Sequence, residues 1–154
     1  MGVLRLLLRA SLNPRRTGYR AAPLWPFVLS LLMLSACGGA PPPSPDAILE
    51  TFRGAGLTVA DVTSADVLRP EVANAAPSCQ AVRFNVVGDD GVRVVVCAQA
   101  SDAAKVATYY RTLGDTNAMF FSHVFEASGG RVVLQANGGL DAALVQQYAD
   151  LLPK

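Results

Sequence analysis

The sequence predicts an α+β domain in which a small antiparallel sheet of two hairpins is covered by about three helices. Two pairs of segments alternate apolar and polar side chains around glycine-containing turns, as hairpin strands do. Segments with apolar residues at helical spacing stand before, between and after these pairs. Hairpins interleaved with helices, rather than strict β-α-β alternation, favour an antiparallel sheet with helices on one face. The expected order is α-β-β-β-α-β-β-α.

The first helix is expected to begin directly after Ser44. The Ser44 hydroxyl suits an N-cap, Pro45 suits the first helical position, and an aspartate follows at the positive end of the helix dipole. The apolar residues at helical spacing are Ile48, Leu49 and Phe52. Gly54 or Gly56 is expected to end the helix, because glycine readily adopts the conformation of a helix C-terminus.

Residues 58–78 carry weaker signals. We expect a short strand at Thr58–Val62, which contains three β-branched residues. Residues 63–78 are expected to form a long connection, because Pro70 and Pro77 interrupt regular structure there.

The clearest strand signal is the pair Cys79–Val87 and Val92–Cys97. The alternating apolar residues of this pair are Val82, Phe84, Val86, Val92, Val94 and Val96. They share one face only if the loop has an odd length, such as Gly88–Asp90. That register also brings Cys79 and Cys97 together on the opposite face, which predicts a disulfide. A two- or four-residue loop would separate them and leave two buried thiols.

The second main helix is expected to start with Ser101 as its N-cap and Asp102 in its first turn, and to end at Gly114. Its apolar face consists of Ala103, Val106, Ala107, Tyr110 and Leu113. This spacing suits a helix that lies on a sheet.

A second hairpin is expected from Ala118 to Ala136. Pairing around its central Ser-Gly turn sets Glu126 opposite Arg131 and Ser122 opposite Gln135, on a partly solvated face. The core face would carry Phe121, His123, Phe125, Val132, Leu134 and Ala136. A last helix is expected to carry Leu140, Leu144, Tyr148, Leu151 and Leu152 along one side and to end at Pro153.

Residues 1–36 have the pattern of an export signal and are set apart from the fold. Five arginines and no acidic residue accompany the apolar run Leu24–Leu34, which only Pro26 and Ser30 interrupt. This run of 11 residues is too short to cross a membrane as a helix, which takes roughly 20 residues. It therefore fits the apolar centre of a cleaved signal peptide.

The run ends in Leu34-Ser35-Ala36-Cys37, followed by two glycines. This stretch resembles the lipobox of bacterial lipoproteins, in which a signal peptidase cuts before a cysteine whose sulfur carries a diacylglycerol. The resemblance implies cleavage between Ala36 and Cys37, and acyl chains such as palmitate on Cys37. It implies a protein exported and lipid-anchored at the cell envelope, at the outer membrane or the outer face of the plasma membrane. The mature domain also resembles domains of uncharacterised bacterial lipoproteins, which carry no named activity.

Two other export signals stay open as alternatives. A general secretory signal would leave Cys37 as an ordinary thiol, whereas the leucine, serine and alanine before it fit the lipoprotein pattern. The pair Arg15-Arg16 is shared with twin-arginine signals. However, residues 17–19 follow where such signals are more apolar.

The lipobox divides the chain into three parts. Residues 1–36 would be the signal peptide, residues 37–44 the lipidated cysteine with a proline-rich tether, and residues 45–154 a single domain. The tether reaches roughly 25 Å if its prolines keep it extended. Assigning Cys37 to the lipid leaves Cys79 and Cys97 as an even pair, as expected in an oxidising compartment.

The domain after the signal is acidic. Five of the 13 basic residues precede the lipobox cysteine, which leaves eight against 12 acidic residues and a net charge of about −4. A basic surface for nucleic acid is therefore not expected, and no nucleic-acid-binding motif occurs. The expected partners are the membrane, through the acyl chains, and an envelope protein.

The sequence carries little catalytic chemistry. His123 is the only histidine, and its place between two phenylalanines on an apolar strand face favours packing over catalysis. One histidine and two bridged cysteines do not supply a zinc site, and the aspartates of the first hairpin turn suit a turn better than calcium. Nucleotide-binding glycine motifs are missing from the sequence, so no cofactor is expected. Phe120, on the face opposite the core face, is a candidate partner contact.

Two functions are compatible with these residues. The first is a non-enzymatic binding or interaction module that is lipid-anchored at the envelope, and it rests on the lipobox and on the lack of a catalytic set. The alternative is an envelope hydrolase or small-ligand carrier that uses the region around His123, with Phe120 and His123 as ligand contacts. A third possibility is a purely structural role.

Overall fold

The computed structural model describes residues 41–65 and 67–154. All of these belong to one compact unit. The predicted signal peptide, residues 1–36, and the predicted lipidation site Cys37 lie outside the described residues. Residues 41–44 run into the first described helix without regular secondary structure. Among the described residues, no helix combines the length and the apolar character needed to span a membrane.

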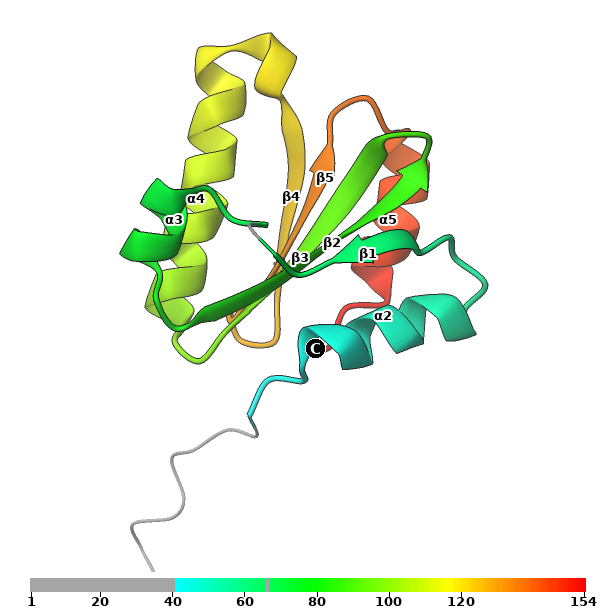
Figure 1. The fold of residues 1–154 in the computed structure, drawn as a ribbon, viewed down its shortest axis with the longest axis horizontal. Coiled ribbons are helices and arrows are strands. Elements are labelled where there is room, and N and C mark those ends of the chain that lie inside the picture. The colour runs from blue at the N-terminus through cyan, green and yellow to red at the C-terminus, as the bar shows by residue number, and fades with distance from the viewer. Residues whose placement is uncertain (1–40, 66) are drawn as a thin grey trace, which may run out of the picture. The chain divides into compact units, whose positions relative to one another are not determined.

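Five antiparallel strands form one sheet with the order β1-β2-β3-β5-β4 (Figure 1). The elements are α2 (Pro45–Gly54), β1 (Ala60–Thr63), α3 (Pro70–Ala75), β2 (Cys79–Val87), β3 (Asp90–Cys97), α4 (Ala100–Thr116), the 3₁₀ helix η2 (Ala118–Phe120), β4 (Ser122–Ala127), β5 (Val132–Asn137) and α5 (Ala142–Asp150). The predicted α+β class is confirmed. The two central strands, β3 and β5, join the two predicted hairpins.

Helices cover both faces of the sheet, so the expectation of helices on one face is wrong. On one face, α2 and α5 pack on side chains such as Phe84, Val94 and Leu134. On the other, α3 and α4 pack on Val95 and Val133 together with the cysteines. The reason is that β3 and β5 carry apolar residues at consecutive positions, and a strand with both faces apolar must be covered twice. We call these the α2/α5 face and the α3/α4 face.

The N-terminal elements follow the sequence signals except at Pro70. The Ser44 hydroxyl accepts a hydrogen bond from the Ala47 amide at 3.2 Å, as expected of an N-cap, and α2 ends at Gly54. The edge strand β1 starts at Ala60, two residues later than expected. Residues 63–78 are not only a connection, because Pro70 opens the helix α3. Proline suits the first turn of a helix, where its missing N–H has no partner to lose.

In the first hairpin, the strand residues lie on their predicted faces, but the turn differs from the predicted one. Cys79 lies opposite Cys97, and Phe84 lies opposite Val92. The register then shifts between Asn85 and Val87, so that Val87 pairs with Asp90. The turn is therefore two residues long rather than three, and the bulge supplies the odd residue. This is why a two-residue turn leaves both cysteines on one face.

Helix α4 starts and ends differently from the expectation. Its N-cap is Gln99, without a side-chain hydrogen bond, so Ser101 lies inside the first turn and is not the cap. The helix continues past Gly114 to Thr116. Gly114 lacks a Cβ where one would lie 3.2 Å from the Cα of Phe121, so its role is close packing rather than helix termination.

The second hairpin is shorter and has a different register. Residues 118–120 form η2, so the strand β4 starts at Ser122 and not at Ala118. Ser122 pairs with Asn137 instead of Gln135, and Glu126 with Val133 instead of Arg131. The shift is two residues, which leaves the residues of β4 and β5 on their predicted faces. Phe121 was expected on the core face, but it precedes β4 and is 51% exposed. Glu126 accepts a hydrogen bond from Arg111 of α4 at 2.8 Å.

Three aromatic rings connect the ends of the chain to the sheet on the α2/α5 face. The ring centroid of Phe52 in α2 lies 5.1 Å from that of Tyr148 in α5 and 6.0 Å from that of Phe84 in β2. The Tyr148 hydroxyl donates to the Thr58 carbonyl at 2.7 Å. The buried polar tip of Tyr148 is thus satisfied and fixes the segment before β1.

Candidate functional site: a groove at the polar end of the sheet

The α3/α4 face is apolar at one end and polar at the other. Its polar end carries Arg93 of β3, Gln135 and Asn137 of β5, and Ser122 of β4. A cavity of about 490 Å³ lies over these residues, which is within the range of small-ligand sites. Its lining is Arg69, Asp90, Arg93, Tyr110, Leu113, Ala118, Met119, Phe120, Phe121, Ser122, Gln135, Asn137, Gly138 and Gly139. We call this cavity the groove.

Arg93 forms the floor of the groove and is held there from three sides. Its Nε donates to the Val67 carbonyl at 3.2 Å, and its Nη1 donates to Gln135 Oε1. The guanidinium carbon lies 5.7 Å from the centroid of the Tyr110 ring, as in a cation–π contact. These contacts fix the plane of the guanidinium and use two of its five donors. The remaining N–H groups are available to a ligand.

The groove has positive charge around Arg93. Burial lowers the pKa of Arg93, and the guanidinium groups of Arg83 and Arg69 lower it further, while Tyr110 opposes them. Among the described residues, no carboxylate forms an ion pair with Arg69 or Arg93. An arginine stays protonated at neutral pH. The floor is therefore a cationic site inside an acidic domain.

Gln135 connects the floor to the rim. It is only 2% exposed, and its Nε2 donates to the Ser122 hydroxyl at 2.9 Å while its Oε1 accepts from Arg93. The Ser122 hydroxyl in turn donates to the Phe120 carbonyl at 3.3 Å. The side chains of Gln135 and Ser122 thus find their hydrogen-bond partners within the protein, and this series of hydrogen bonds gives Arg93 a rigid support.

The outer wall of the groove is apolar and exposed. Met119 is 85% exposed, Phe120 44% and Phe121 51%. The wall is positioned by Gly138, whose amide donates to the Phe121 carbonyl at 3.1 Å. A Cβ at Gly138 would lie 2.5 Å from that carbonyl oxygen, so no larger residue fits there without movement.

The lining of the groove also contains a carboxylate. Asp90, at the start of β3, accepts a hydrogen bond from the Asn137 side chain at 3.2 Å. A Cβ at Gly139 would lie 2.9 Å from Asp90 Oδ2, so the missing side chain leaves room for this carboxylate. The groove thus contains a cationic floor, an apolar wall and a carboxylate.

The structure separates the two residues that the sequence suggested as ligand contacts. Phe120 lines the groove, but His123 does not. His123 lies on the α2/α5 side of β4, opposite Ala136, and its ring packs edge-on against Phe121 with centroids 5.2 Å apart. Within the described residues, no group of three or more histidines, cysteines or carboxylates could hold a metal ion.

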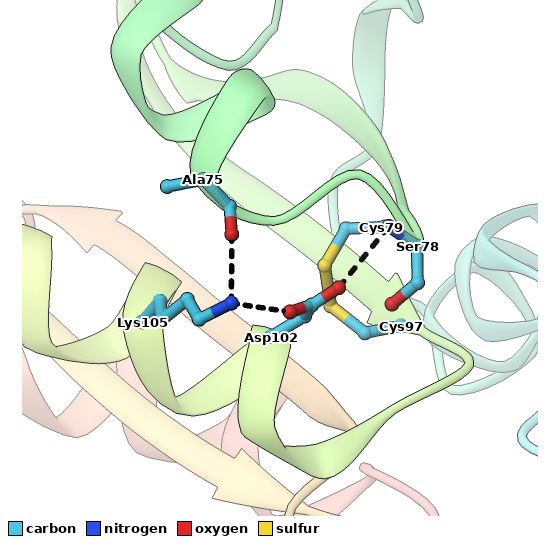
Figure 2. A network of polar contacts seen from close by, with 6 residues as sticks. All are labelled: Ala75, Ser78, Cys79, Cys97, Asp102 and Lys105. Atoms are coloured by element: carbon cyan, nitrogen blue, oxygen red, sulfur yellow. Dashed lines mark hydrogen bonds and ion pairs between the residues drawn. A yellow bond between two sulfur atoms is a disulfide. The ribbon is translucent and has the colours of Figure 1, made fainter.

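The predicted disulfide between Cys79 and Cys97 is confirmed and lies at the apolar end of the same face. Figure 2 shows the polar network beside it. The Asp102 carboxylate accepts from the Ser78 amide at 3.2 Å and from Lys105 Nζ at 2.8 Å. Lys105 also donates to a carbonyl at the end of α3 at 2.9 Å. The hydrogen bond with Lys105, followed by those with Ser78, lowers the pKa of Asp102. This network joins α3 and β2 to α4.

Sequence reasoning missed Arg93, Gln135 and Asn137 as site residues. In the first hairpin Arg93 alternates with valines, which is the pattern of a solvated face. The useful signal would have been a polar residue in each of two strands that are otherwise apolar on both faces. That signal becomes informative only when β3 and β5 are known to pair.

Comparisons with protein-family models, with curated proteins and with solved structures found no match for this chain. Inference about function therefore rests on the geometry of the groove and on the sequence.

Proposed function

We propose that this chain is a lipid-anchored protein of the bacterial cell envelope whose domain binds a small ligand with a carboxylate and an apolar group. The observation that carries the binding role is the groove, in which the buried side of Arg93 is fixed and other N–H groups remain for a ligand. The lipobox ending in Cys37 supports the anchor.

The charge distribution favours an anionic ligand at the floor. Arg69 and Arg93 both line the groove, and a guanidinium with free N–H groups binds a carboxylate through charge-assisted hydrogen bonds. Because Gln135 holds Arg93 in place, little side-chain entropy is lost on binding. The floor therefore suits a carboxylate.

The exposed wall favours an apolar group beside that carboxylate. Three consecutive residues, Met119, Phe120 and Phe121, have large exposed apolar side chains. A ligand that covers them would remove this apolar surface from water. Leu113 and Tyr110 continue this apolar lining toward the floor.

The placement of the groove suits a ligand from the aqueous side of the envelope. Residues 42–44, the last part of the tether, line a surface pocket with Ser78 and Ala98, next to the disulfide end of β2 and β3. The groove includes Asp90, at the other end of β3. A strand of eight residues separates these ends by about 25 Å. In Figure 1, residues 41–44 lie at the end of the domain away from the turn between α4 and β4.

The groove supports binding better than hydrolysis. Ser122 is the one serine in its lining, and the Ser122 hydroxyl is bonded to Gln135 and to the Phe120 carbonyl. A serine nucleophile needs a base within hydrogen-bond distance. His123 points to the other face of the sheet, so it does not supply that base.

The binding role is tested with the full chain in lipid nanodiscs, using isothermal titration calorimetry and empty nanodiscs as the blank. The probes are 3-phenylpropanoate and its neutral amide. We expect the anion to bind more tightly, and Arg93→Gln to weaken its binding about tenfold or more because a charged hydrogen bond is lost. Arg53→Gln is the matched control, since Arg53 is exposed on α2. Equal binding of both probes to both variants would contradict the proposal.

The anchor is tested separately. Mass spectrometry of the purified protein should show acyl chains on Cys37, and Cys37→Ala should move the protein from the membrane to the soluble fraction. Membrane association that survives the substitution would refute the anchor.

A further inference from the structure

We infer that the ligand is zwitterionic, a short apolar peptide or amino acid whose carboxylate binds Arg93 and whose ammonium group binds Asp90. This inference rests on the proposed function and adds two things: the ligand has a positive group, and Asp90 binds that group. It starts from a feature that an anion site alone does not explain, namely a carboxylate in the lining of a cationic groove.

Asp90 is placed to accept a further hydrogen bond. Its Oδ1 accepts from Asn137, and an ionised carboxylate has lone pairs for several more donors. Among the described residues, no lysine or arginine forms an ion pair with it. Asp90 is half-buried, and its carboxylate packs closely against Gly139, where a Cβ would lie 2.9 Å from Oδ2. An ammonium group of a ligand would supply the missing charge.

Among the described residues, Asp90 and Arg93 do not form an ion pair with each other. Asp90 and Arg93 are three residues apart in β3, which corresponds to about 10 Å between their Cα atoms. Both residues line the same groove, and the Asp90 carboxylate accepts a hydrogen bond from Asn137, which also lines it. A molecule with a positive and a negative end can therefore contact both, while its apolar side chain lies on Phe120 and Phe121.

Electrostatics distinguish this ligand from a simple anion. The Asp90 carboxylate repels an anion on Arg93 but attracts the ammonium group of a zwitterion. At the effective dielectric of a protein surface, a charge pair about 10 Å apart changes affinity on the order of tenfold. The size of the cavity, about 490 Å³, leaves room for a dipeptide.

The test uses three forms of one dipeptide and the full chain in nanodiscs. Alanyl-phenylalanine has both charges, N-acetyl-alanyl-phenylalanine lacks the positive charge, and alanyl-phenylalanine amide lacks the negative charge. By calorimetry we expect the free dipeptide to bind about tenfold more tightly than the acetylated form. We expect Asp90→Asn to remove this difference, because asparagine keeps the acceptor for Asn137 but loses the charge. Asp115→Asn, on α4, is the matched control.

The outcomes separate this inference from the proposed function. If the free and acetylated dipeptides bind equally to the unmodified chain, the zwitterion inference is overturned, while dependence on the carboxylate and on Arg93 still supports the anion site. If neither these dipeptides nor 3-phenylpropanoate bind, both the inference and the proposed function fail. Because blocking the peptide amine makes the same test without a substitution, the result does not depend on the folding of the Asp90→Asn variant.

Discussion

Breaking the Cys79–Cys97 cross-link should destabilise the domain by about 3 kcal/mol. The two cysteines are 18 residues apart in sequence, and closing a loop of that size removes about 3 kcal/mol of chain entropy from the unfolded state. For a domain of this size the loss corresponds to a fall in melting temperature of about 12 °C. Urea unfolding followed by far-ultraviolet circular dichroism measures it in the oxidised protein, the reduced protein and the Cys79→Ala/Cys97→Ala variant.

The reduced protein is the informative comparison, because it keeps both sulfur atoms in the α3/α4 face and lacks only the covalent bond. The double variant also loses the packing of Cys97, which is fully buried, and should be less stable than the reduced protein. A loss below about 1 kcal/mol on reduction would refute the entropic argument. It would show that hairpin contacts already hold these strands together in the unfolded chain.

Three further predictions concern single side chains. The low pKa of Asp102 means that its contribution to stability is present above the unfolded pKa and is lost as pH falls through the folded pKa. The gap in melting temperature between the wild type and Asp102→Asn should therefore be seen at pH 6 and shrink below about pH 4; a constant gap would argue against it. Tyr148→Phe should cost about 1 kcal/mol in urea unfolding through the lost hydrogen bond to Thr58, and an unchanged midpoint would contradict this reading. Gly138→Ala should cost about 1 to 3 kcal/mol, because its Cβ meets the Phe121 carbonyl at 2.5 Å. It should also weaken 3-phenylpropanoate binding by moving the apolar wall. A variant as stable as the wild type would show that the backbone at Phe121 can move to make room for the added methyl group.

Local signals predicted the parts of the fold that depend on neighbouring residues. The Ser44 cap follows from the chemistry of a few adjacent positions, the disulfide from the alternation within one hairpin, and the α+β class from the periodicity of each segment. The side of the sheet on which each strand residue lies was also correct in both hairpins, because a two-residue shift in the second hairpin does not change it. In the first hairpin, the bulge adds one residue to the two-residue turn, so the strand residues lie on the same faces as with the expected three-residue loop.

The rest depends on contacts between distant segments. The pairing of β3 with β5 brings the two hairpins into one sheet, and no signal within either hairpin specifies that pairing. The site was missed for the same reason, since Arg93 and Gln135 become neighbours only through that pairing. At Pro70 and Ser101 the error was local: proline can open a helix as well as interrupt one, and the serine lies two positions past the true cap.

The position of β5 between β3 and β4 also constrains the order of folding. Each hairpin can form within microseconds from residues close in sequence. Pairing β3 with β5, by contrast, joins Val94 to Leu134, with α4 and β4 between them in the sequence. Non-local pairings of this kind slow folding. Until Val132–Asn137 is available, β3 therefore lacks one of its two neighbouring strands.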